Sequence, residues 1–432
     1  MKKRPQHIII LGAGFAGLYA YLELHKIFHR QPGAIEITLV SNKDFFLFVP
    51  MIHEVATGTL TPASIIQPIR TIPQCCLKRF VQAQVESVDL DKQQVQIKTL
   101  PKPVDATHDA QSIHTLKYDY LIMGLGSTAN FFNIPGAKEF GLVLKNLKDA
   151  KHIKNRIIRN FERAQYETED EQKSLLTFVI IGGGATGVEL AGEIADLISH
   201  ELNKAFPKLA PQARVIILQS SNKLVQHADE WFARQAKAIL ERKKNVIIRC
   251  GVRVTRVASE GVYIGDEFIR THAAIWTAGV KANRVDIKAN KTIKRDSRTE
   301  RLVVNDFLQL PDYHHTFVAG DQTYIIYKEA QQPYPMRAQF AVKQGQISAQ
   351  NIKQLITQQP LKEFHWQDKG IILSLGKGGA LAQAKGLKFS GPLAWWIYRT
   401  IYLSKLIGTR MKLRTALEWT VNLFTSRDIS KL

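Results

Sequence analysis

Two short segments of nearly the same design, 170 residues apart, constrain this chain most. His7–Leu24 reads HIIILGAGFAGLYAYLEL, and Thr177–Ile194 reads TFVIIGGGATGVELAGEI. Each has a β-branched apolar run, then a glycine-rich turn, then a helical pattern of apolar residues. A further strand-like run follows each helix, at Glu36–Val40 and at Arg214–Ser221. The sequence therefore predicts two βαβ units of the dinucleotide-binding type.

The three glycines of each turn have separate physical roles. The first makes the tight turn, the second lets the backbone approach a pyrophosphate, and the third lets helix and strand pack closely. The phosphate charge then lies at the positive N-terminal end of the helix. Two such turns in matching contexts predict two bound dinucleotides, which suggests a flavin, a nicotinamide and electron transfer between them. The residues are Gly12, Gly14 and Gly17 in the first unit and Gly182, Gly184 and Gly187 in the second.

Neither unit carries the acidic residue that commonly binds a ribose at the end of the second strand. The first unit has Ser41 and Lys43 there, so neutral hydrogen bonds would replace the acid. The second unit has Gln219 at that point, with Lys223 close behind. Since no carboxylate repels a 2′-phosphate at Gln219, tolerance of NADPH beside NADH is a hypothesis.

The order of segments along the chain predicts that the second unit is inserted into the first. A β-rich stretch covers Phe80–Leu100, charged helix-forming residues fill Lys145–Lys173, and the strand style of the first unit returns near His315–Gln322. We expect an α/β fold with two Rossmann-like dinucleotide-binding domains and a C-terminal module. The predicted division is 1–145 and 286–365 for the first domain, 146–285 for the inserted domain and 366–432 for the module.

The net charge of +21 on 432 residues is unusually high and raises the question of an anionic partner. The basic residues are spread along the chain without a concentrated run, and no nucleic-acid-binding motif is present, so we predict no nucleic-acid partner. No apolar stretch reaches the ~18 residues of a spanning helix. The three cysteines, Cys75, Cys76 and Cys250, have neither CxxC nor zinc spacing, and we predict no metal site.

The C-terminal segment Gly391–Leu432 has its own character. Trp395–Ile407 is apolar nearly all round, and Gly408 is a plausible break. After it, Leu413, Leu417, Val421 and Phe424 recur on one helical stripe, flanked by Arg410, Lys412 and Arg414. Such a helix pair suits a membrane interface, where basic side chains reach anionic headgroups. A packing helix or a dimer interface explains the same pattern, and the residues alone leave the choice open.

Taken together, the sequence resembles the type II NADH:quinone oxidoreductases, single-chain flavoenzymes of the respiratory chain. The resemblance covers essentially the whole chain, and the ordered set of motifs makes it specific. The motifs are GAGFAGL, LFVPMIHEVATG (Leu47–Gly58), GGGATGVELAGE (Gly182–Glu193), WTAGVKA (Trp276–Ala282), VAGD (Val318–Asp321), AQFAVKQG (Ala338–Gly345), GIILSLGKGGALA (Gly370–Ala382) and the aromatic, basic tail.

The resemblance implies FAD on the first unit and NADH, as substrate, on the second. A carboxylate at Asp321 is chemically suited to accept hydrogen bonds from ribityl hydroxyls. With the strand-end residues above, the predicted cofactor contacts outside the glycine turns are Ser41, Lys43, Pro50, Gly126, Gly320, Asp321 and Ala338 for the flavin and Gln219, Ala278 and Gly279 for the nicotinamide nucleotide.

The resemblance also implies two catalytic residues, Glu189 and Gln339. A carboxylate in the first turn of a helix is stabilised by ~0.3–1 kcal/mol wherever it occurs, but the family places Glu189 near the nicotinamide and the flavin. Gln339 would lie by the flavin at the quinone entrance, with its amide available to a quinone carbonyl. Where the family commonly has a second glutamine this chain has Lys343, with Gln344 one place later, so the role of Lys343 stays open.

The function we predict is a FAD-dependent NADH:quinone oxidoreductase that pumps no protons. Its expected partners are a membrane quinone (ubiquinone or menaquinone) and an anionic membrane surface, at the cytoplasmic face of the cell membrane. A homodimer is a further hypothesis. Two alternatives are a flavoprotein reductase with a ferredoxin-type protein acceptor and a nicotinamide-binding redox sensor. A disulfide reductase is excluded because no redox-active cysteine pair is present.

Overall fold

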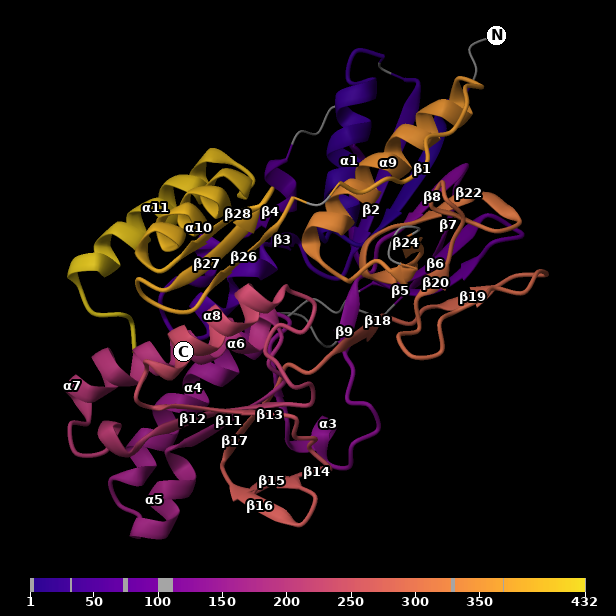
Figure 1. The fold of residues 1–432 in the computed structure, drawn as a ribbon. Coiled ribbons are helices and arrows are strands. Elements are labelled where there is room, and N and C mark those ends of the chain that lie inside the picture. The colour runs from indigo at the N-terminus through magenta and orange to yellow at the C-terminus, as the bar shows by residue number, and fades with distance from the viewer. Residues whose placement is uncertain are drawn as a thin grey trace. The chain divides into compact units, whose positions relative to one another are not determined.

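The structure is a computed structural model that describes residues 4–31, 33–72, 77–99, 112–327, 331–367 and 369–431. The chain forms two compact units, each made of three segments. The first comprises Met1–Leu47, Gln67–Thr128 and Val280–Gln367, and the second comprises Phe48–Ile66, Ala129–Gly279 and Asp368–Leu432. Figure 1 labels the helices and strands of both.

The first unit is built on an open sheet. Its elements are β1 (Gln6–Leu11), α1 (Phe15–Phe28), β2 (Ile35–Ser41), β3 (Phe45–Leu47), β5 (Leu77–Asp89), β6 (Gln94–Thr99), β7 (Ile113–Lys117), β8 (Tyr120–Met123), β18 (Val280–Ala282), β19 (Asp286–Lys288), β20 (Leu302–Val303), β21 (Gln309–Leu310), β22 (Tyr313–Val318), β23 (Thr323–Tyr324), β24 (Ile326–Tyr327), β25 (Gln332–Pro333) and α9 (Ala338–Ile356). Two strands, β4 (Ile66–Pro68) and β9 (Ser127–Ala129), fall at its boundaries.

The strand order in the sheet of the first unit is β21-β22-β8-β1-β2-β5-β6-β7, and β19 also pairs with β5. Strands β22, β8, β1, β2 and β5 run parallel to one another, with Ile8 opposite Ile37 on one side and Tyr120 on the other. The isoleucines of β1 are fully buried, as expected for a strand covered on both faces. This arrangement confirms the first predicted βαβ unit.

Helices α1 and α9 lie side by side in the first unit (Figure 1). A Cβ built on Gly345 of α9 would stand only 2.2 Å from the carbonyl oxygen of Ala16 in α1. The glycine therefore permits a backbone-to-backbone approach that no other residue allows. This contact fixes the start of α1, where the first glycine turn ends.

The second unit contains a separate five-stranded parallel sheet. Its elements are α2 (Ile52–Val55), α3 (Ala137–Phe140), β10 (Leu142–Val143), α4 (Leu147–Ala164), α5 (Glu169–Leu175), β11 (Thr177–Ile181), α6 (Ala185–Asp196), a π-helical turn (Leu197–Leu202), α7 (Asn203–Ala205), β12 (Arg214–Gln219), α8 (Glu230–Glu241), β13 (Val246–Cys250), β14 (Arg256–Ala258), β15 (Gly261–Ile264), β16 (Glu267–Arg270), β17 (Ala273–Trp276), β26 (Ile371–Ser374), β27 (Ala380–Ala384), β28 (Leu387–Ser390), α10 (Pro392–Lys405) and α11 (Thr409–Phe424). Short 3-10 turns lie at Val49–Met51, Pro62–Ser64, Ile69–Thr71, Ala210–Gln212 and Gly320–Gln322 of the two units.

The strand order of the parallel sheet is β10-β17-β11-β12-β13. Strand β11 pairs with β12, Phe178 opposite Val215, and with β17, Phe178 opposite Ala273. Helix α6 follows β11 directly and packs against β12. The second predicted βαβ unit is thereby confirmed.

The C-terminal helices belong to the second unit. Helix α10 ends at Lys405, Gly408 adopts a positive φ of 82°, and α11 begins at Thr409, which confirms the predicted break. Figure 1 shows α10 and α11 (yellow) beside each other and beside the antiparallel sheet of β26, β27 and β28. The predicted stripe Leu413, Leu417, Val421 and Phe424 is exposed, by 51% to 85% of each side chain.

None of the helices in the described ranges combines the length and the apolar character needed to cross a bilayer. By contacts, Phe48–Ile66 and the C-terminal segment both group with the second unit, since α2 packs against α6, and β26 and β27 pack against α6 and α8. The predicted four-part division, which concerns folding domains, stays a prediction.

Candidate active site

The first glycine turn uses its three glycines in different ways. A Cβ on Gly12, whose φ is 96°, would lie 2.3 Å from the carbonyl oxygen of Gly124, and one on Gly17 would lie 1.8 Å from that of Gly12. Packing inside the protein therefore requires both. A Cβ on Gly14 would meet no protein atom within 4 Å. No contact within the protein requires a glycine at position 14. The glycine instead leaves room for a ligand to approach the backbone at this turn.

The second turn repeats this arrangement. A Cβ on Gly182 would lie 2.6 Å from the Cα of Ala278, and one on Gly187 would lie 1.9 Å from the carbonyl oxygen of Gly182. The middle glycine, Gly184, again meets nothing within 4 Å. Helices α1 and α6 both start at these middle glycines without a side-chain cap and without an acidic residue in the first turn. Both helix ends thus have room and free N–H groups for a pyrophosphate.

The residues predicted around the flavin include a hydrogen-bonded cluster in the first unit. The hydroxyl of Ser127 donates to a carboxylate oxygen of Asp321 at 2.5 Å. The backbone N–H of Gly320 donates to the side-chain oxygen of Gln344 at 2.7 Å, which holds Gly320 at its positive φ of 77°. Gly126 has a positive φ of 73° and open space where its Cβ would stand. The cluster places a carboxylate and an exposed peptide edge together, a donor set that suits polyhydroxyl and phosphate groups.

Two further residues of this cluster escaped the sequence analysis. The side-chain oxygen of Gln322 accepts a hydrogen bond from the N–H of Leu125 at 2.8 Å, and its amide donates to the carbonyl of Asn283 at 3.0 Å. The Asn283 amide in turn donates to the carbonyl of Leu125 at 2.7 Å. Gln322 directly follows Asp321, but its structural role depends on partners more than 30 residues away.

The remaining predicted flavin and quinone residues take these positions. Ser41 is buried at the end of β2, and its hydroxyl accepts the backbone N–H of Lys43 at 3.2 Å. Ala338 and Gln339 form the partly exposed first turn of α9, with Lys343 on the same helix. Pro50 lies in the turn Val49–Met51, which belongs to the second unit. Their predicted contacts with cofactor and quinone stay predictions.

The side chain of Gln219 supports the second glycine turn. Its oxygen accepts the backbone N–H of Gly183 at 2.7 Å, and its amide donates to the hydroxyl of Ser221. Lys223, which we considered as a partner for a 2′-phosphate, donates to the carbonyl of Ala228 at 3.0 Å and lies 3.6 Å from Glu230. Ala278 and Gly279 follow β17 directly, where Ala278 packs against the turn.

Glu189 lies buried on α6, and the prediction that it lies in the first turn of the helix is wrong, because α6 begins at Ala185 and Glu189 falls in the second turn. One of its carboxylate oxygens is 3.8 Å from Nδ1 of His53, which is itself 99% buried. Burial raises the pKa of the Glu189 carboxyl well above its usual range, and a hydrogen bond from the backbone of Ser374 only partly opposes this. Burial likewise lowers the pKa of His53 to about 4, so the imidazole is neutral at physiological pH.

Glu193, one turn further along α6, is held as a carboxylate. Its Oε2 lies 2.9 Å from Nη1 of Arg427 and accepts hydrogen bonds from Thr59 at 2.8 Å and Thr57 at 3.3 Å. Burial alone would raise its pKa, but the charge of Arg427 and the hydrogen bond from Thr59 lower the pKa below the usual value. This ion pair is almost fully buried on both sides.

Glu54, on α2, is a second buried carboxyl beside Glu193. The Tyr398 hydroxyl donates to Oε1 at 3.1 Å, and the indole N–H of Trp419 donates to Oε2 at 2.7 Å. Burial, followed by the charge of Glu193, raises the pKa of Glu54 to about 7, against the opposing effects of Trp419, Arg399 and Tyr398. Its donors come from α10 and α11.

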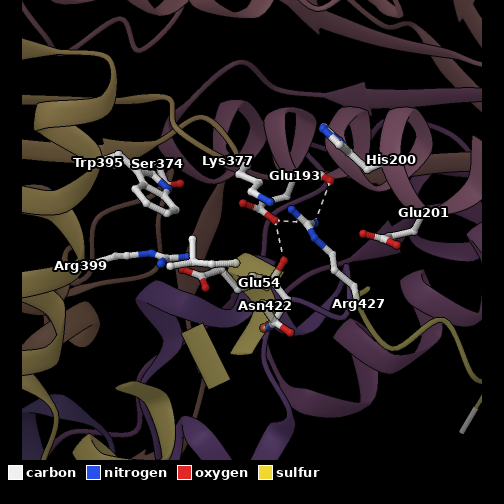
Figure 2. A pocket seen from close by; sticks show the side chains of 12 residues that line it. Glu54, Glu193, His200, Glu201, Ser374, Lys377, Trp395, Arg399, Asn422 and Arg427 are labelled. Atoms are coloured by element: carbon white, nitrogen blue, oxygen red, sulfur yellow. Dashed lines mark hydrogen bonds and ion pairs between the residues drawn. The ribbon is translucent and has the colours of Figure 1, made fainter. Parts of the chain in front are cut away.

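A small polar cavity adjoins these carboxyls (Figure 2). The space open to the centre of a water-sized sphere is about 30 Å³, enough for about two waters. In Figure 2, Arg399 approaches on the side of Glu54 and Arg427 on the side of Glu193. The lining residues are Glu54, Thr59, Glu193, His200, Glu201, Ser374, Lys377, Trp395, Arg399, Asn422, Leu423 and Arg427.

The motif Leu47–Gly58 contains Glu54, but no sequence pattern assigns a role to this carboxyl. Tyr398 and Trp419 read only as members of an apolar tail, and their partner is 344 and 365 positions away. Of the cysteines, Cys75 and Cys76 lie outside the described residues, while burial raises the pKa of the partly buried Cys250 thiol and keeps it protonated. Within the described ranges no three His, Cys, Asp or Glu side chains are grouped to hold a metal ion.

The comparison with known families agrees with this geometry. Residues 6–345 match the pyridine nucleotide-disulphide oxidoreductase family, and residues 369–428 match the NDH2 C-terminal domain. The first match spans both glycine turns and more than half of the chain, so the fold and the two turns define a pyridine-nucleotide-dependent oxidoreductase.

Similar proteins narrow the assignment. A probable NADH dehydrogenase of Dictyostelium discoideum is 30% identical over 98% of this chain and 91% of its own. The type II NADH:quinone oxidoreductase Ndh of Mycobacterium tuberculosis is 31% identical over 98% of this chain and 89% of its own. The solved structure of NDH2 from Plasmodium falciparum in complex with NADH matches with a TM-score of 0.88 at 18% identity, covering 99% of this chain and 100% of that one, which confirms the fold. This chain therefore belongs to the type II NADH:quinone oxidoreductase family, a family of NADH dehydrogenases.

Proposed function

We propose that this protein transfers a hydride from NADH to FAD and passes the two electrons to a membrane quinone, without pumping protons. The observation that carries the proposal is the pair of glycine turns, each with a middle glycine that internal packing does not require. It is supported by the match of residues 369–428 to the NDH2 C-terminal domain.

The first unit fits FAD by its donor set. The open turn at Gly14 and the N-terminus of α1 would hold the pyrophosphate. Asp321, held by Ser127, would accept hydrogen bonds from ribityl hydroxyls, and Ser41 would bind the ribose. A bound flavin supplies the redox chemistry that the side chains lack, since it accepts a hydride and releases electrons.

The second unit fits NADH at Gly184. There the nucleotide's pyrophosphate would meet the N-terminus of α6, while Gln219 keeps the turn in shape through Gly183. Glu189 is buried in the second turn of the same helix, and burial, which raises its pKa well above the usual range, favours its neutral form. A neutral carboxyl avoids an unpaired negative charge beside the incoming dinucleotide.

The exposed face of α11 would attach the protein to the cytoplasmic face of the cell membrane. Leu413, Leu417, Val421 and Phe424 form one apolar stripe open to solvent, and the basic side chains of Arg410 and Arg414 flank it. An apolar stripe with flanking cations is the pattern of an interfacial helix. The net charge of +21 favours an anionic leaflet, where the lipid-soluble quinone is dissolved.

Steady-state oxidation of NADH by the flavin-loaded protein tests the reaction. We expect NADH consumption that requires a soluble quinone, with NADPH as the comparison substrate. If NADH reduces the flavin but no quinone reoxidises it, the quinone assignment is wrong and a protein acceptor replaces it.

Flotation on lipid vesicles tests the attachment separately. The protein should bind vesicles containing phosphatidylglycerol better than neutral ones, and Leu417→Glu should lower the binding about tenfold, equal to ~1.4 kcal/mol. Gln165→Glu, which adds the same charge at an exposed position outside α11, is the matched control. Equal loss from both variants would show that charge alone, and not the stripe, governs binding.

A further inference from the structure

The two buried carboxyls beside the cavity differ in what neutralises them. Glu193 has an arginine at 2.9 Å and two threonine hydroxyls. Glu54 is 98% buried and has hydrogen bonds from a phenol and an indole, neither of which carries a charge. Within the described residues it forms no ion pair, and Arg399 acts on it only from beyond 4 Å. A fold that pairs one buried carboxyl with a cation and leaves its neighbour without one makes the second carboxyl easier to protonate.

The surroundings of Glu54 extend over several elements. On its own helix lies His53, which is neutral. The titratable and charged groups that act on Glu54 from other elements are Glu189 and Glu193 on α6 and Tyr398, Arg399 and Tyr402 on α10. Arg427 after α11 and Lys377 after β26 line the same cavity. Helix α4, which packs against α2, carries Lys154, and this lysine pairs with Asp428. Arg399 keeps its charge at neutral pH, because burial lowers its pKa only to about 10.

The cavity connects this carboxyl to the surface of the second unit. Its wall begins at the buried Glu54 and Glu193 and ends at the exposed His200 and Lys377. Polar lining and a volume of about 30 Å³ make it a site for bridging water, which passes protons readily between hydrogen-bonded partners. Glu54 thus stands at the inner end of a short polar path.

The proposed reaction needs a proton from solution. NADH gives up a hydride, which is two electrons and one proton, while a quinol holds two added electrons and two added protons. Each turnover, NADH + H⁺ + quinone → NAD⁺ + quinol, therefore consumes one proton that must reach the interior. The established chemistry includes no source for it other than water.

We propose that Glu54 takes up this proton from the water-sized cavity and holds it, oriented by Tyr398 and Trp419, for the reduction of quinone. This inference rests on the proposed function and adds a proton path to it. Glu54 is a proton-relay residue, acting through its neighbours, since nothing places it against the substrate itself.

The electrostatics of the cluster suit that role. A pKa of about 7 makes Glu54 protonated and deprotonated in comparable amounts at neutral pH, which allows both uptake and release. Glu189, Tyr398 and Tyr402 are its electrostatic neighbours, and the two tyrosine rings lie 4.4 Å apart. Burial also raises the pKa of Glu189 well above its usual range, and the Tyr398 hydroxyl, which donates to Glu54 at 3.1 Å, is the first group to which a proton leaving Glu54 can pass.

Half-reaction kinetics of Glu54→Gln test the proposal. In stopped flow, NADH should reduce the flavin of the variant at the rate of the unmodified protein. Reoxidation by a soluble quinone should be at least about tenfold slower, and its decline above pH 7 should disappear. Ferricyanide accepts electrons without protons, so it should reoxidise both proteins equally.

Glu418→Gln is the matched control. Glu418 also joins α11 to the segment Phe48–Ile66, accepting the N–H of Thr61 at 2.8 Å and its hydroxyl at 2.7 Å, but it is not among the residues that line the cavity. This variant should keep the rate and pH profile of quinone reoxidation. If Glu54→Gln also keeps both, or if it slows ferricyanide and quinone to the same extent, Glu54 is no proton relay.

Tyr398→Phe provides a test that does not depend on removing the carboxyl. Its hydroxyl lowers the pKa of Glu54, so its loss should move the pH step of quinone reoxidation to higher pH. A step that stays in place, or the absence of any step between pH 6 and 8 in the unmodified protein, overturns the proposal. An unmodified protein that reduces ferricyanide but no quinone instead refutes the proposed function, before any variant is made.

Discussion

Replacing Arg427 with methionine should destabilise the second unit strongly and in a pH-dependent way. Arg427 and Glu193 lie 2.9 Å apart with side chains only 9% and 4% exposed. Removing the cation leaves a buried carboxylate with two hydroxyl donors, and breaking such a pair costs ~3–5 kcal/mol. We expect a loss of ~3 kcal/mol in the free energy of unfolding, at the lower end of this range, because the hydrogen bonds from Thr57 and Thr59 remain. At ~2–4 °C per kcal/mol, this loss lowers the melting temperature by roughly 6–12 °C.

The pH dependence follows from the sign of the pKa shift. In the native protein the pKa of Glu193 is lowered, so its stabilisation is present above the unfolded value of ~4.3 and is lost as pH falls through the lower folded value. Without Arg427 burial dominates and the pKa rises above the unfolded value. The variant therefore loses most stability at pH 7.5 and least at pH 5, where Glu193 becomes protonated.

Thermal unfolding at both pH values, followed by tryptophan fluorescence, measures the effect. Glu193→Gln combined with Arg427→Met should recover much of the loss, since no charge is then buried alone. Arg414→Met, which breaks the more exposed pair with Glu418 at 3.2 Å, should cost less than ~1 kcal/mol. An Arg427→Met protein that melts within 2 °C of its parent, or equally early at both pH values, would refute the reasoning.

Three further predictions concern the dinucleotide sites. Gly14→Ala should leave the fold intact but lower the flavin content, as measured by absorbance of the purified protein. Gly17→Ala should instead reduce the yield of soluble protein, because its Cβ would stand 1.8 Å from a carbonyl oxygen. Gln219→Ala should raise the KM for NADH several-fold through loss of a hydrogen bond to the turn worth ~1 kcal/mol, with flavin content unchanged. Ser127→Ala should weaken flavin binding by a similar amount in a titration of the apoprotein, and unchanged affinity would exclude Asp321 from the site.

The local parts of the fold could be predicted because their signals are short. A β-branched run, three spaced glycines and an apolar helix define each βαβ unit within about 20 residues, and β1, α1, β11 and α6 appear where expected. The break at Gly408 was predictable for the same reason, because its positive φ suits glycine alone.

The carboxyl cluster could not be predicted, because it depends on contacts between distant segments. Glu54 comes from a short helix in the motif that contains the predicted flavin contact Pro50, and its donors come from the inner faces of α10 and α11. The periodicity of apolar residues in the tail correctly predicted the exposed stripe of α11. The same pattern counts Trp419 as apolar, although its indole N–H is a hydrogen-bond donor. Only the tertiary fold shows that its N–H meets a carboxylate.

The two faces of the C-terminal helix pair have a practical consequence for making this enzyme in a soluble form. Cutting the chain before α10 would remove the exposed apolar stripe, but it would also remove Tyr398, Arg399, Trp419 and Arg427 from around Glu54 and Glu193. In the shortened protein, Glu54 and Glu193 would lose these partners and become exposed to water. Their pKa values would change, and the second unit would be less stable. Handling properties are therefore better improved by polar substitutions along the outer stripe, which leave the inner face and its acids as they are.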